Sequence, residues 1–400
     1  MFINKMTLLS SKVANWHSAK SISKTLSRGR MCVGITVNRL EDINTHARKF
    51  SNGLNQHCMT MRDALISFGY DVVFIKSNNK KCDNAMRPYA QMSNPMAIAG
   101  CDVILVVGIH IPKTIAQVCA LLGISIVYLS LGNDLLYDID DMFPPGRTSK
   151  KLCMECVPSN LYVETWVSPH FWYARHYYEH ITRSKVYKVP YFWDSRYTDK
   201  THADMLDIAP GKLSVGVFES NGLHGKNCLF PTIICNKALH EGSINNAVIY
   251  CTQTLRKQSW WPRFESLADH PKIKFDNRYV FQGIMSQVCN VVVSWTEDCD
   301  LNYLAFECFH LGIPLIHNSK TLRNYGFYYE RNEVDDAIEH LRRLNTMGFD
   351  RDAYMHKNRK ALVEYSIEGS GFLPFFKRRL ASLMATRSQE SYSQRLKKIK

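Results

Sequence analysis

The sequence predicts an α/β protein with two Rossmann-like domains in series and a C-terminal helical tail. Three observations lead to this fold class. The chain has 400 residues, 46% apolar and 22% charged, which is typical of a globular protein of two or three domains. Short β-branched runs alternate with helical patterns, as in a doubly wound parallel sheet. This alternation stops near residue 190 and restarts after residue 210.

We expect five segments along the chain. They are a basic extension over residues 1–30, a Rossmann-like domain over 31–190, a linker over 191–210, a second Rossmann-like domain over 211–345, and a helical tail with a basic end over 346–400. The linker is predicted there because the stretch is polar and has no clear period.

The first predicted domain opens with a strand–loop–helix–strand unit. Met31–Val37 is a β-branched run typical of a buried strand, a helical pattern follows from Ser51 through Phe68, and Tyr70–Ile75 is the next strand. Gly69 ends the helix between them. The remaining elements are the strands Val103–Val107, Ile124–Leu129, Glu164–Val167 and Lys185–Val189, and a helix over Thr114–Leu122.

The same pattern restarts in the second half. Lys212–Phe218 is a strand, a loop with two glycines follows over Ser220–Asn227, and Cys228–Leu239 is helical. The next elements are the strands Ala247–Cys251, Ile273–Phe275, Val291–Trp295 and Ile313–His317, a helix over Leu301–Leu311, and helical tail segments over Val334–Leu344, Asp352–Tyr365 and Leu373–Ala385. Two such sheets are expected to direct the carboxyl ends of their strands toward a central cleft, where ligands bind in these folds.

The formal net charge of +14 resides at the ends of the chain. Residues 1–31 hold six basic side chains and no acid, and residues 377–400 hold eight basic side chains against Glu390, which leaves +1 for the body. The basic ends are suited to a polyanion, whereas the charge count says little about a central site.

Hydropathy and cysteine usage favour a protein of a reducing compartment. No uncharged apolar run approaches the length of a membrane span. The 13 cysteines lie mainly inside apolar segments and form no disulfide pattern, which favours the cytoplasm, or the host cytoplasm if the protein is viral. The acid-free, Ser- and Lys-rich start has the composition of a transit peptide, and a dispensable extension fits it equally well.

The most specific stretch of the sequence is Val291–Ser319. It predicts a strand, an acidic loop, a helix that ends at Gly312 and a strand that begins near Pro314. A helix that starts near Asp300 presents free backbone N–H groups to a phosphate. Glu307, about two turns into that helix, is suited to accept hydrogen bonds from ribose hydroxyls.

This stretch resembles the donor-site signature of GT-B nucleotide-sugar glycosyltransferases, in which a strand and a loop precede Glu-x4-Gly-x-Pro and another strand. More narrowly, the sequence resembles a bacterial and phage family of uncharacterised, glycosyltransferase-like proteins over roughly residues 31–345. The segments that carry this resemblance are Val33–Val37, Ser51–Gln56, Val167–Phe171, Val189–Asp194, and Leu301–Leu304 through His317–Ser319.

The resemblance implies a GT-B fold with an N-terminal acceptor domain and a C-terminal donor domain. It implies that Glu307 binds the donor ribose and that the preceding loop, with Glu297 and Asn302, meets the sugar and the diphosphate. Many retaining members carry a second glutamate eight positions before the first, where this chain has Cys299. The stereochemical outcome therefore stays open, with Glu297 and Asp298 as the nearest acids.

Two glycine-containing loops are the predicted phosphate contacts. In the second half, Gly225 permits close backbone approach and Lys226 is suited to neutralise a diphosphate leaving group. A surface loop with a solvated lysine is the alternative. Ser51-Asn52-Gly53 occupies the matching place in the first half, where an ordinary helix N-cap explains Ser51 or Asn52 almost as well.

Acid–base candidates come from the first half. His110 follows one predicted strand and Asp134 follows the next, so each is expected at the carboxyl end of a strand. An inverting reaction needs such a base to deprotonate the acceptor hydroxyl. Ser168-Pro169-His170 is similarly placed, and a structural role in a loop is the alternative for all of them.

We therefore predict a glycosyltransferase that transfers a hexose or pentose from a nucleoside-diphosphate sugar, such as a UDP-sugar, to an acceptor hydroxyl. We expect no tightly bound cofactor and no required metal, because Cys153-Met-Glu-Cys156 lacks the second ligand pair of a zinc site and Lys226 can serve the diphosphate. The candidate acceptors are a glycan, a lipid and hydroxymethylated viral DNA. The alternatives are a catalytically inactive sugar- or DNA-binding protein of the same fold and a sugar-nucleotide epimerase; the sequence leaves the oligomeric state open.

Overall fold

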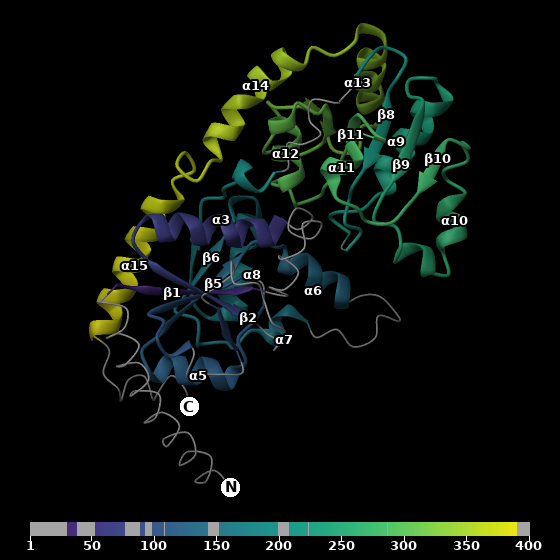
Figure 1. Ribbon diagram of the computed structural model, residues 1–400. Helices are drawn as coiled ribbons and strands as arrows, with labels where there is room; N and C mark the ends of the chain where they lie inside the picture. Colours follow the sequence, from purple (N-terminus) through teal and green to yellow (C-terminus); the bar gives the residue numbers. More distant parts are fainter. Residues whose placement is uncertain are drawn as a thin grey trace. The chain divides into compact units, whose positions relative to one another are not determined.

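The computed structural model describes residues 30–37, 53–76, 89–92, 98–107, 109–142, 152–198, 208–222, 224–285 and 287–389. The chain forms two compact units (Figure 1). The first contains the strand β1 (Cys32–Val37), residues 54–192 and the last helix α15 (Phe372–Gln389), and the second contains residues 193–369. Each unit has a parallel sheet flanked by helices, which confirms the predicted pair of Rossmann-like domains.

The first unit is built on a seven-stranded parallel sheet in the order β3-β2-β1-β4-β5-β6-β7. After β1 its strands are β2 (Asp71–Lys76), β3 (Tyr89–Gln91), β4 (Val103–Val106), β5 (Ser125–Ser130), β6 (Glu164–Val167) and β7 (Lys185–Lys188). Every residue of β4, β5 and β6 is buried. Such continuous burial is typical of central strands that are covered on both faces, which explains why their sequences show apolar runs instead of alternation.

Helices cover both faces of this sheet. In Figure 1, α3 (Gly53–Ser67) and α5 (Lys113–Leu121) lie on opposite sides of it. The other helices of the unit are α6 (Asp134–Met142), α7 (Cys153–Cys156), the 3-10 helix η3 (Pro169–Ala174) and α8 (Arg175–Thr182). The helices α6, α7 and α8 are absent from our prediction; they are short, with nine, four and eight residues.

The last helix, α15, belongs to the first unit although it ends the described chain. Arg379 on α15 forms a two-pronged ion pair with Glu164 of β6. Phe375 and Phe376 contact the Trp166 ring edge-on, with centroid distances of 5.2 and 5.9 Å. We predicted one tail over 346–400, whereas the structure divides its described part between the two units, because α15 supplies aromatic side chains that cover β6.

The second unit is built on a six-stranded parallel sheet in the order β10-β9-β8-β11-β12-β13. The strands are β8 (Ser214–Val217), β9 (Asn246–Ile249), β10 (Ile273–Phe275), β11 (Val291–Val293), β12 (Leu315–His317) and β13 (Phe327–Tyr328). The strands β8, β9 and β11 form a core with α9 (Leu229–His240) and α13 (Val334–Met347), which contact each other. The helices α12 (Tyr303–Leu311) and α14 (Arg351–Glu364) form a second contacting pair.

Shorter elements complete the second unit. They are the 3-10 helices η4 (Ser195–Tyr197) and η6 (Leu255–Lys257) and the helices α10 (Trp261–Glu265) and α11 (Phe281–Met285). The predicted linker over 191–210 starts with Tyr191, Phe192 and Trp193, which are all buried. These aromatic side chains therefore belong to the packed cores, and the polar character on which we based the linker applies to the residues after them.

Two further properties follow from the described residues. None of their helices combines the length and the hydrophobicity that a bilayer span requires. Their cysteines are free thiols, and most are buried in the apolar core.

Candidate functional site

The second sheet has a topological switch point between β8 and β11. From β8 the chain proceeds through β9 to β10 in one direction, and from β11 through β12 to β13 in the other. Loops that follow the carboxyl ends of the two strands at such a point form the usual ligand site of open α/β sheets. Here these loops are residues 218–228 after β8 and residues 294–302 after β11, and the predicted residues Gly225, Lys226, Glu297 and Asn302 all belong to them.

The loop after β8 is held by its own side chains. Phe218 stacks on Tyr250 at a centroid distance of 4.8 Å. Asn221 adopts a left-handed backbone conformation with φ of 53°, its Oδ1 accepts from the Cys228 N–H at 2.8 Å, and its Nδ2 donates to the Cys251 carbonyl at 3.3 Å. These contacts hold the loop at Phe218 and Asn221.

A backbone hydrogen bond joins the two predicted site loops. The Glu297 N–H donates to the Gly225 carbonyl at 2.9 Å, so the structure brings together two residues that lie 72 positions apart in the sequence. Lys226, next to Gly225, is half-buried, and its ammonium makes no hydrogen bond or ion pair with the residues that the structure describes. The Glu297 side chain is exposed. The arrangement thus offers a cation that is available to an anionic ligand.

The helix α12 starts two residues later than predicted. We expected it at Leu301, but Asn302 is the N-cap, and its side-chain oxygen accepts from the Leu304 N–H at 3.4 Å. Asparagine is a preferred N-cap residue, which is why the helix starts at Tyr303. Asp300 is held in turn by the loop after β12, because its carboxylate accepts from Thr321 Oγ1 at 2.7 Å.

Glu307 lies in the buried part of α12. Its side chain is 5% exposed between the core residues Phe306 and Cys308. The helix ends at Gly312, as predicted, in a left-handed conformation with φ of 66°. Cys299, which stands where many retaining glycosyltransferases have a second glutamate, is also buried. The backbone conformation at the end of the helix therefore explains why the motif has glycine at position 312. The carboxylate of Glu307 is shielded from bulk water.

Gly53 is the first residue of α3 and is assigned to the second unit. A Cβ atom at this position would lie 3.1 Å from Cγ of Tyr303, so close packing is a sufficient reason for glycine here. Ser51 and Asn52, which we considered as N-cap residues, lie outside the described residues. The role of Gly53 at a phosphate stays a prediction.

Sequence reasoning missed Glu219, which directly follows the buried end of β8. Its side chain is 1% exposed, and its Oε1 accepts from Ser294 Oγ at 2.6 Å and from the Trp295 N–H at 3.2 Å. The carboxylate thereby connects the ends of β8 and β11. One feature of the sequence could have indicated Glu219: it is an acidic residue immediately after an apolar strand. Acidic side chains are rarely buried unless they have partners.

The first sheet has its own switch point, between β1 and β4. Thr36 Oγ1 at the end of β1 accepts from the Val107 N–H at 2.8 Å and donates to the Ile109 carbonyl at 3.1 Å. This pair of hydrogen bonds holds the segment that leads to His110. His110 follows the end of β4, which lies at this switch point, and its role stays a prediction.

His110 and Asp134 both contact Tyr128 of β5. The His110 ring centroid lies 5.3 Å from that of Tyr128, and its Nδ1 lies 3.5 Å from the Tyr162 hydroxyl. The Tyr128 hydroxyl donates to Oδ2 of Asp134, the first residue of α6, and Ser130 Oγ donates to the same oxygen at 3.4 Å. One tyrosine thus links the two predicted acid–base residues.

The two titratable groups are shifted in opposite directions by the same cause. Burial lowers the pKa of His110, which therefore tends to be neutral. Burial raises the pKa of Asp134 to about 6, against the hydrogen bond from Tyr128, which lowers it. A carboxyl group that titrates near neutrality is suited to general acid–base chemistry.

The remaining candidates of the first unit have structural contacts. Ser168 Oγ donates to the Ser130 carbonyl at 3.2 Å, and the His170 ring lies 3.8 Å from that of Phe171. Cys153 and Cys156 delimit α7, and the buried Asp138 accepts from the Cys153 N–H at 2.5 Å. In the described parts of the chain, no three His, Cys, Asp or Glu side chains gather as a metal site would require.

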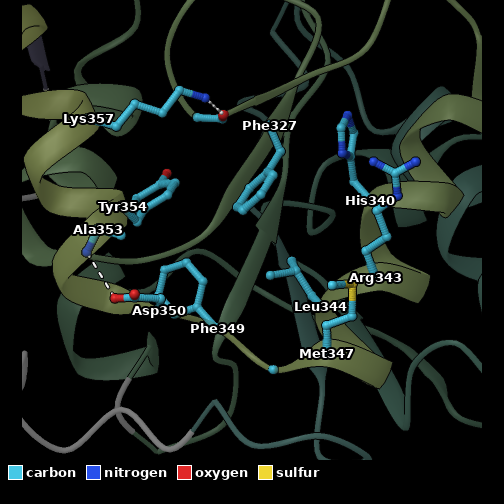
Figure 2. Close-up of a pocket in the computed structure, with 12 residues that line it drawn as sticks. Phe327, His340, Arg343, Leu344, Met347, Phe349, Asp350, Ala353, Tyr354 and Lys357 are labelled. Atoms are coloured by element: carbon cyan, nitrogen blue, oxygen red, sulfur yellow. Dashed lines mark hydrogen bonds between the residues drawn. The ribbon is translucent and has the colours of Figure 1, made fainter.

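A separate pocket of about 430 Å³ lies between β13, α13 and α14 in the second unit (Figure 2). Phe327 and Tyr354 stack at 5.5 Å within it. Its charged side chains have partners, since Lys357 donates to the Gly326 carbonyl at 3.0 Å and Asp350 accepts from the Ala353 N–H at 2.9 Å. None of the predicted site residues lines this pocket, and we assign it no part in donor binding.

Several solved structures of GT-B glycosyltransferases are similar in fold to this chain. An α-glucosyltransferase in complex with UDP-glucose and DNA containing an abasic site is 12% identical, with a TM-score of 0.56 over 89% of this chain and 100% of the other. Sucrose-phosphate synthase from Thermosynechococcus elongatus is 11% identical, with a TM-score of 0.53 over 88% and 100%. HepE from Anabaena in complex with UDP is 13% identical, with a TM-score of 0.52 over 88% and 100%.

The protein thus has the GT-B fold that its sequence predicts. A comparison with curated proteins finds no match. The family model described as "Protein of unknown function (DUF2827)" matches residues 33–380, and the chain belongs to this family.

Proposed function

We propose that this protein is a glycosyltransferase that uses a nucleoside-diphosphate sugar, with UDP-sugars as the first class to test. One observation carries the proposal. At the switch point of the second sheet, the loop with the available cation Lys226 is hydrogen-bonded through Gly225 to the loop that precedes α12. A cation at this position stabilises the negative charge of a departing diphosphate.

The other predicted residues receive roles that fit this chemistry. Lys226 neutralises the diphosphate, Glu307 accepts hydrogen bonds from the ribose, and Glu297 and Asn302 contact the sugar. In the first unit, Asp134 takes the proton of the acceptor hydroxyl, with His110 as the second candidate. The GT-B fold of the UDP-bound structures supports the choice of donor.

The first test measures donor binding and turnover. We expect UDP and a UDP-sugar to raise the melting temperature, because a ligand at about 100 Kd stabilises a protein by about 2.7 kcal/mol. Lys226→Ala should lower kcat more than it raises KM, since the ammonium acts on charge that develops in the transition state. Lys237→Ala is the matched control, because Lys237 is an exposed lysine of the same unit that pairs with Asp335.

The outcome also decides between transfer and its rivals. Release of UDP with a glycosylated acceptor supports transfer, whereas a changed sugar on intact UDP indicates epimerisation. Binding of a UDP-sugar with no product from glycan, lipid and DNA acceptors would favour a binding protein. Equal kinetics for Lys226→Ala and Lys237→Ala would remove Lys226 from the site.

Among the candidate acceptors, DNA is supported by the basic ends of the chain and by the similar α-glucosyltransferase whose structure contains DNA. Deleting residues 1–29 and 390–400 should leave UDP binding unchanged and weaken binding to hydroxymethylated duplex DNA. It should also reduce the salt dependence, since each phosphate contact contributes a slope of about −0.9 in log K against log salt. An unchanged salt slope in the truncated protein would count against DNA.

A further inference from the structure

Glu219 occupies a place in the second unit that connects its two central strands. It follows β8, and its Oε1 accepts from Ser294 Oγ at 2.6 Å and from the Trp295 N–H at 3.2 Å at the end of β11. Ser294 is fixed from a third strand, because the Tyr329 hydroxyl after β13 donates to the Ser294 carbonyl at 3.0 Å. A single carboxylate oxygen therefore sets where the 294–302 loop begins.

The second oxygen of the same carboxylate is buried and unsatisfied. Oε2 has no hydrogen-bond partner among the described residues, although the side chain is only 1% exposed. A buried carboxylate is costly unless a partner or a nearby cation compensates for the lost hydration. The pKa of Glu219 is raised by burial, and the Ser294 hydrogen bond, the charge of Lys226 and the Trp295 N–H oppose this shift.

Among the residues that the structure describes, Lys226 is the cation whose charge favours ionised Glu219. The other titratable groups that interact with Glu219 come from neighbouring elements: Cys228 before α9, Cys251 after β9 and Tyr329 after β13. Burial raises the pKa of all three, so they are neutral in the relevant pH range and do not compensate for a negative charge. The charge of Lys226 thus favours the ionised form of Glu219.

We propose that Glu219 is a positioning residue of the donor site, which holds the 294–302 loop with one oxygen and is electrostatically coupled to Lys226 through its charge. The proposal rests on the proposed function, in which Lys226 binds a diphosphate. When an anion neutralises Lys226, ionised Glu219 loses its compensating charge and takes up one proton from solvent on the carboxylate. No other bond forms or breaks. A carboxylate with a purely structural role would keep the same protonation with and without the ligand.

The first experiment needs no ligand, so it remains decisive even if the donor proves to be wrong. The unfolding midpoint in urea is measured between about pH 5 and about pH 8, where buried carboxyl groups titrate, for the wild type, Glu219→Gln, Lys226→Ala and the double variant. We expect Lys226→Ala to lower the midpoint more at the alkaline end, where a larger fraction of Glu219 is ionised, than at the acid end. In the Glu219→Gln background this pH-dependent difference should disappear, because glutamine keeps an acceptor for Ser294 but carries no charge.

The second experiment measures the protons. Titration calorimetry with UDP, and with inorganic pyrophosphate as a second probe, is repeated in two buffers with different ionisation enthalpies. We expect a buffer-dependent heat that corresponds to proton uptake, its loss in Glu219→Gln, and its retention in Ser294→Ala and in Glu265→Gln, an exposed carboxylate of α10 that serves as the matched control.

The result that would contradict the proposed function differs from the result that would contradict the coupling between Glu219 and Lys226. Failure of both probes to bind contradicts the donor site but leaves the urea experiment to decide the coupling. An equal effect of Lys226→Ala in both backgrounds at every pH, or proton uptake that persists in Glu219→Gln, would show that Glu219 is a structural carboxylate and nothing more.

Discussion

The environment of Asp134 in the first unit differs from that of an ordinary surface carboxylate. Burial raises its pKa from 3.8 to about 6, although Tyr128 donates a hydrogen bond to it. Its folded-state pKa therefore exceeds its unfolded value, so its contribution to stability is present below about pH 4 and is lost as the pH rises through about 6. At neutral pH the ionised group is a cost to the fold.

This cost leads to a prediction for Asp134→Asn. We expect the variant to be more stable than the wild type at neutral pH, by on the order of 3 kcal/mol, and to lose that advantage at acid pH. If Asp134 is the acceptor base, turnover should fall sharply in the variant, and wild-type kcat/KM should decline below about pH 6 as the carboxylate is protonated. Urea midpoints at two pH values and steady-state rates measure both effects. A more stable variant with full turnover would make Asp134 structural.

Glu307 supports a second prediction at this scale. Glu307→Gln keeps the volume and an acceptor oxygen but removes the charge, so we expect the helix to fold and the donor affinity to fall. The loss of a hydrogen bond to a charged group costs about 1.5–3 kcal/mol. Titration calorimetry with UDP reports the affinity, and an unchanged melting temperature shows that the fold is intact. Equal affinity for UDP would exclude Glu307 from the ribose.

At the scale of elements, Gly312 explains why the predicted motif contains glycine. The residue ends α12 in a left-handed conformation, and a Cβ atom would lie 2.6 Å from Nε of Arg351. The same arginine donates from Nη2 to the Leu311 carbonyl at 2.7 Å and thereby satisfies the end of the helix. Both the backbone conformation and the space exclude a side chain.

We therefore expect Gly312→Ala to destabilise the second unit by more than backbone strain alone. The left-handed conformation costs about 1–2 kcal/mol for a residue with a Cβ, and displacement of Arg351 adds to it. Gly242→Ala is the matched control, because Gly242 follows α9 with φ of 73°, and a Cβ there would meet no described atom within 4 Å beyond its chain neighbours. Urea unfolding of both variants separates strain from steric conflict, and equal losses would show that Arg351 moves without cost.

A comparison of the elements shows which strands and helix ends can be predicted from the sequence. Long apolar runs such as those of β1 and β5 predict the strands correctly, because burial on both faces leaves a continuous pattern. The helix α12 starts two residues later than predicted because the side chain of Asn302 caps it. This capping outweighs the apolar character of Leu301, on which the prediction was based. The two-residue strand β13 carries too short a pattern to be read from the sequence.

The sequence predicts candidate site residues that directly follow a strand. It does not predict those that depend on contacts between residues far apart in the chain. Gly225, Lys226 and Glu297 were predicted from their loops, but the hydrogen bond that joins the loops links residues 72 positions apart. Glu219 was missed for the same reason, since its partners Ser294 and Trp295 lie on another strand. A single carboxylate in the sequence gives no sign of such partners.

At the scale of the whole molecule, the stability of the first unit depends on a helix near the end of the chain. Phe376 on α15 is 1% exposed and contacts the rings of Trp166 and Tyr70. We expect Phe376→Ala to destabilise the first unit by about 3–5 kcal/mol and to leave the second unit unaffected. Hydrogen exchange that is monitored separately over residues 103–130 and 213–249 measures this difference. Equal protection losses in both regions would mean that the units unfold as one.

The return of α15 to the first unit also determines the order in which the protein can fold during synthesis. The second unit is one contiguous segment apart from residues 50–53, so all its residues are available as soon as residue 369 has left the ribosome. The first unit starts earlier but lacks the helix that covers β6 until residues 372–389 are made. Trp166 is therefore uncovered during the translation of about 200 further residues. A ribosome that stops early, or a protease that trims the C-terminus, therefore damages the unit that was made first and spares the one that was made second.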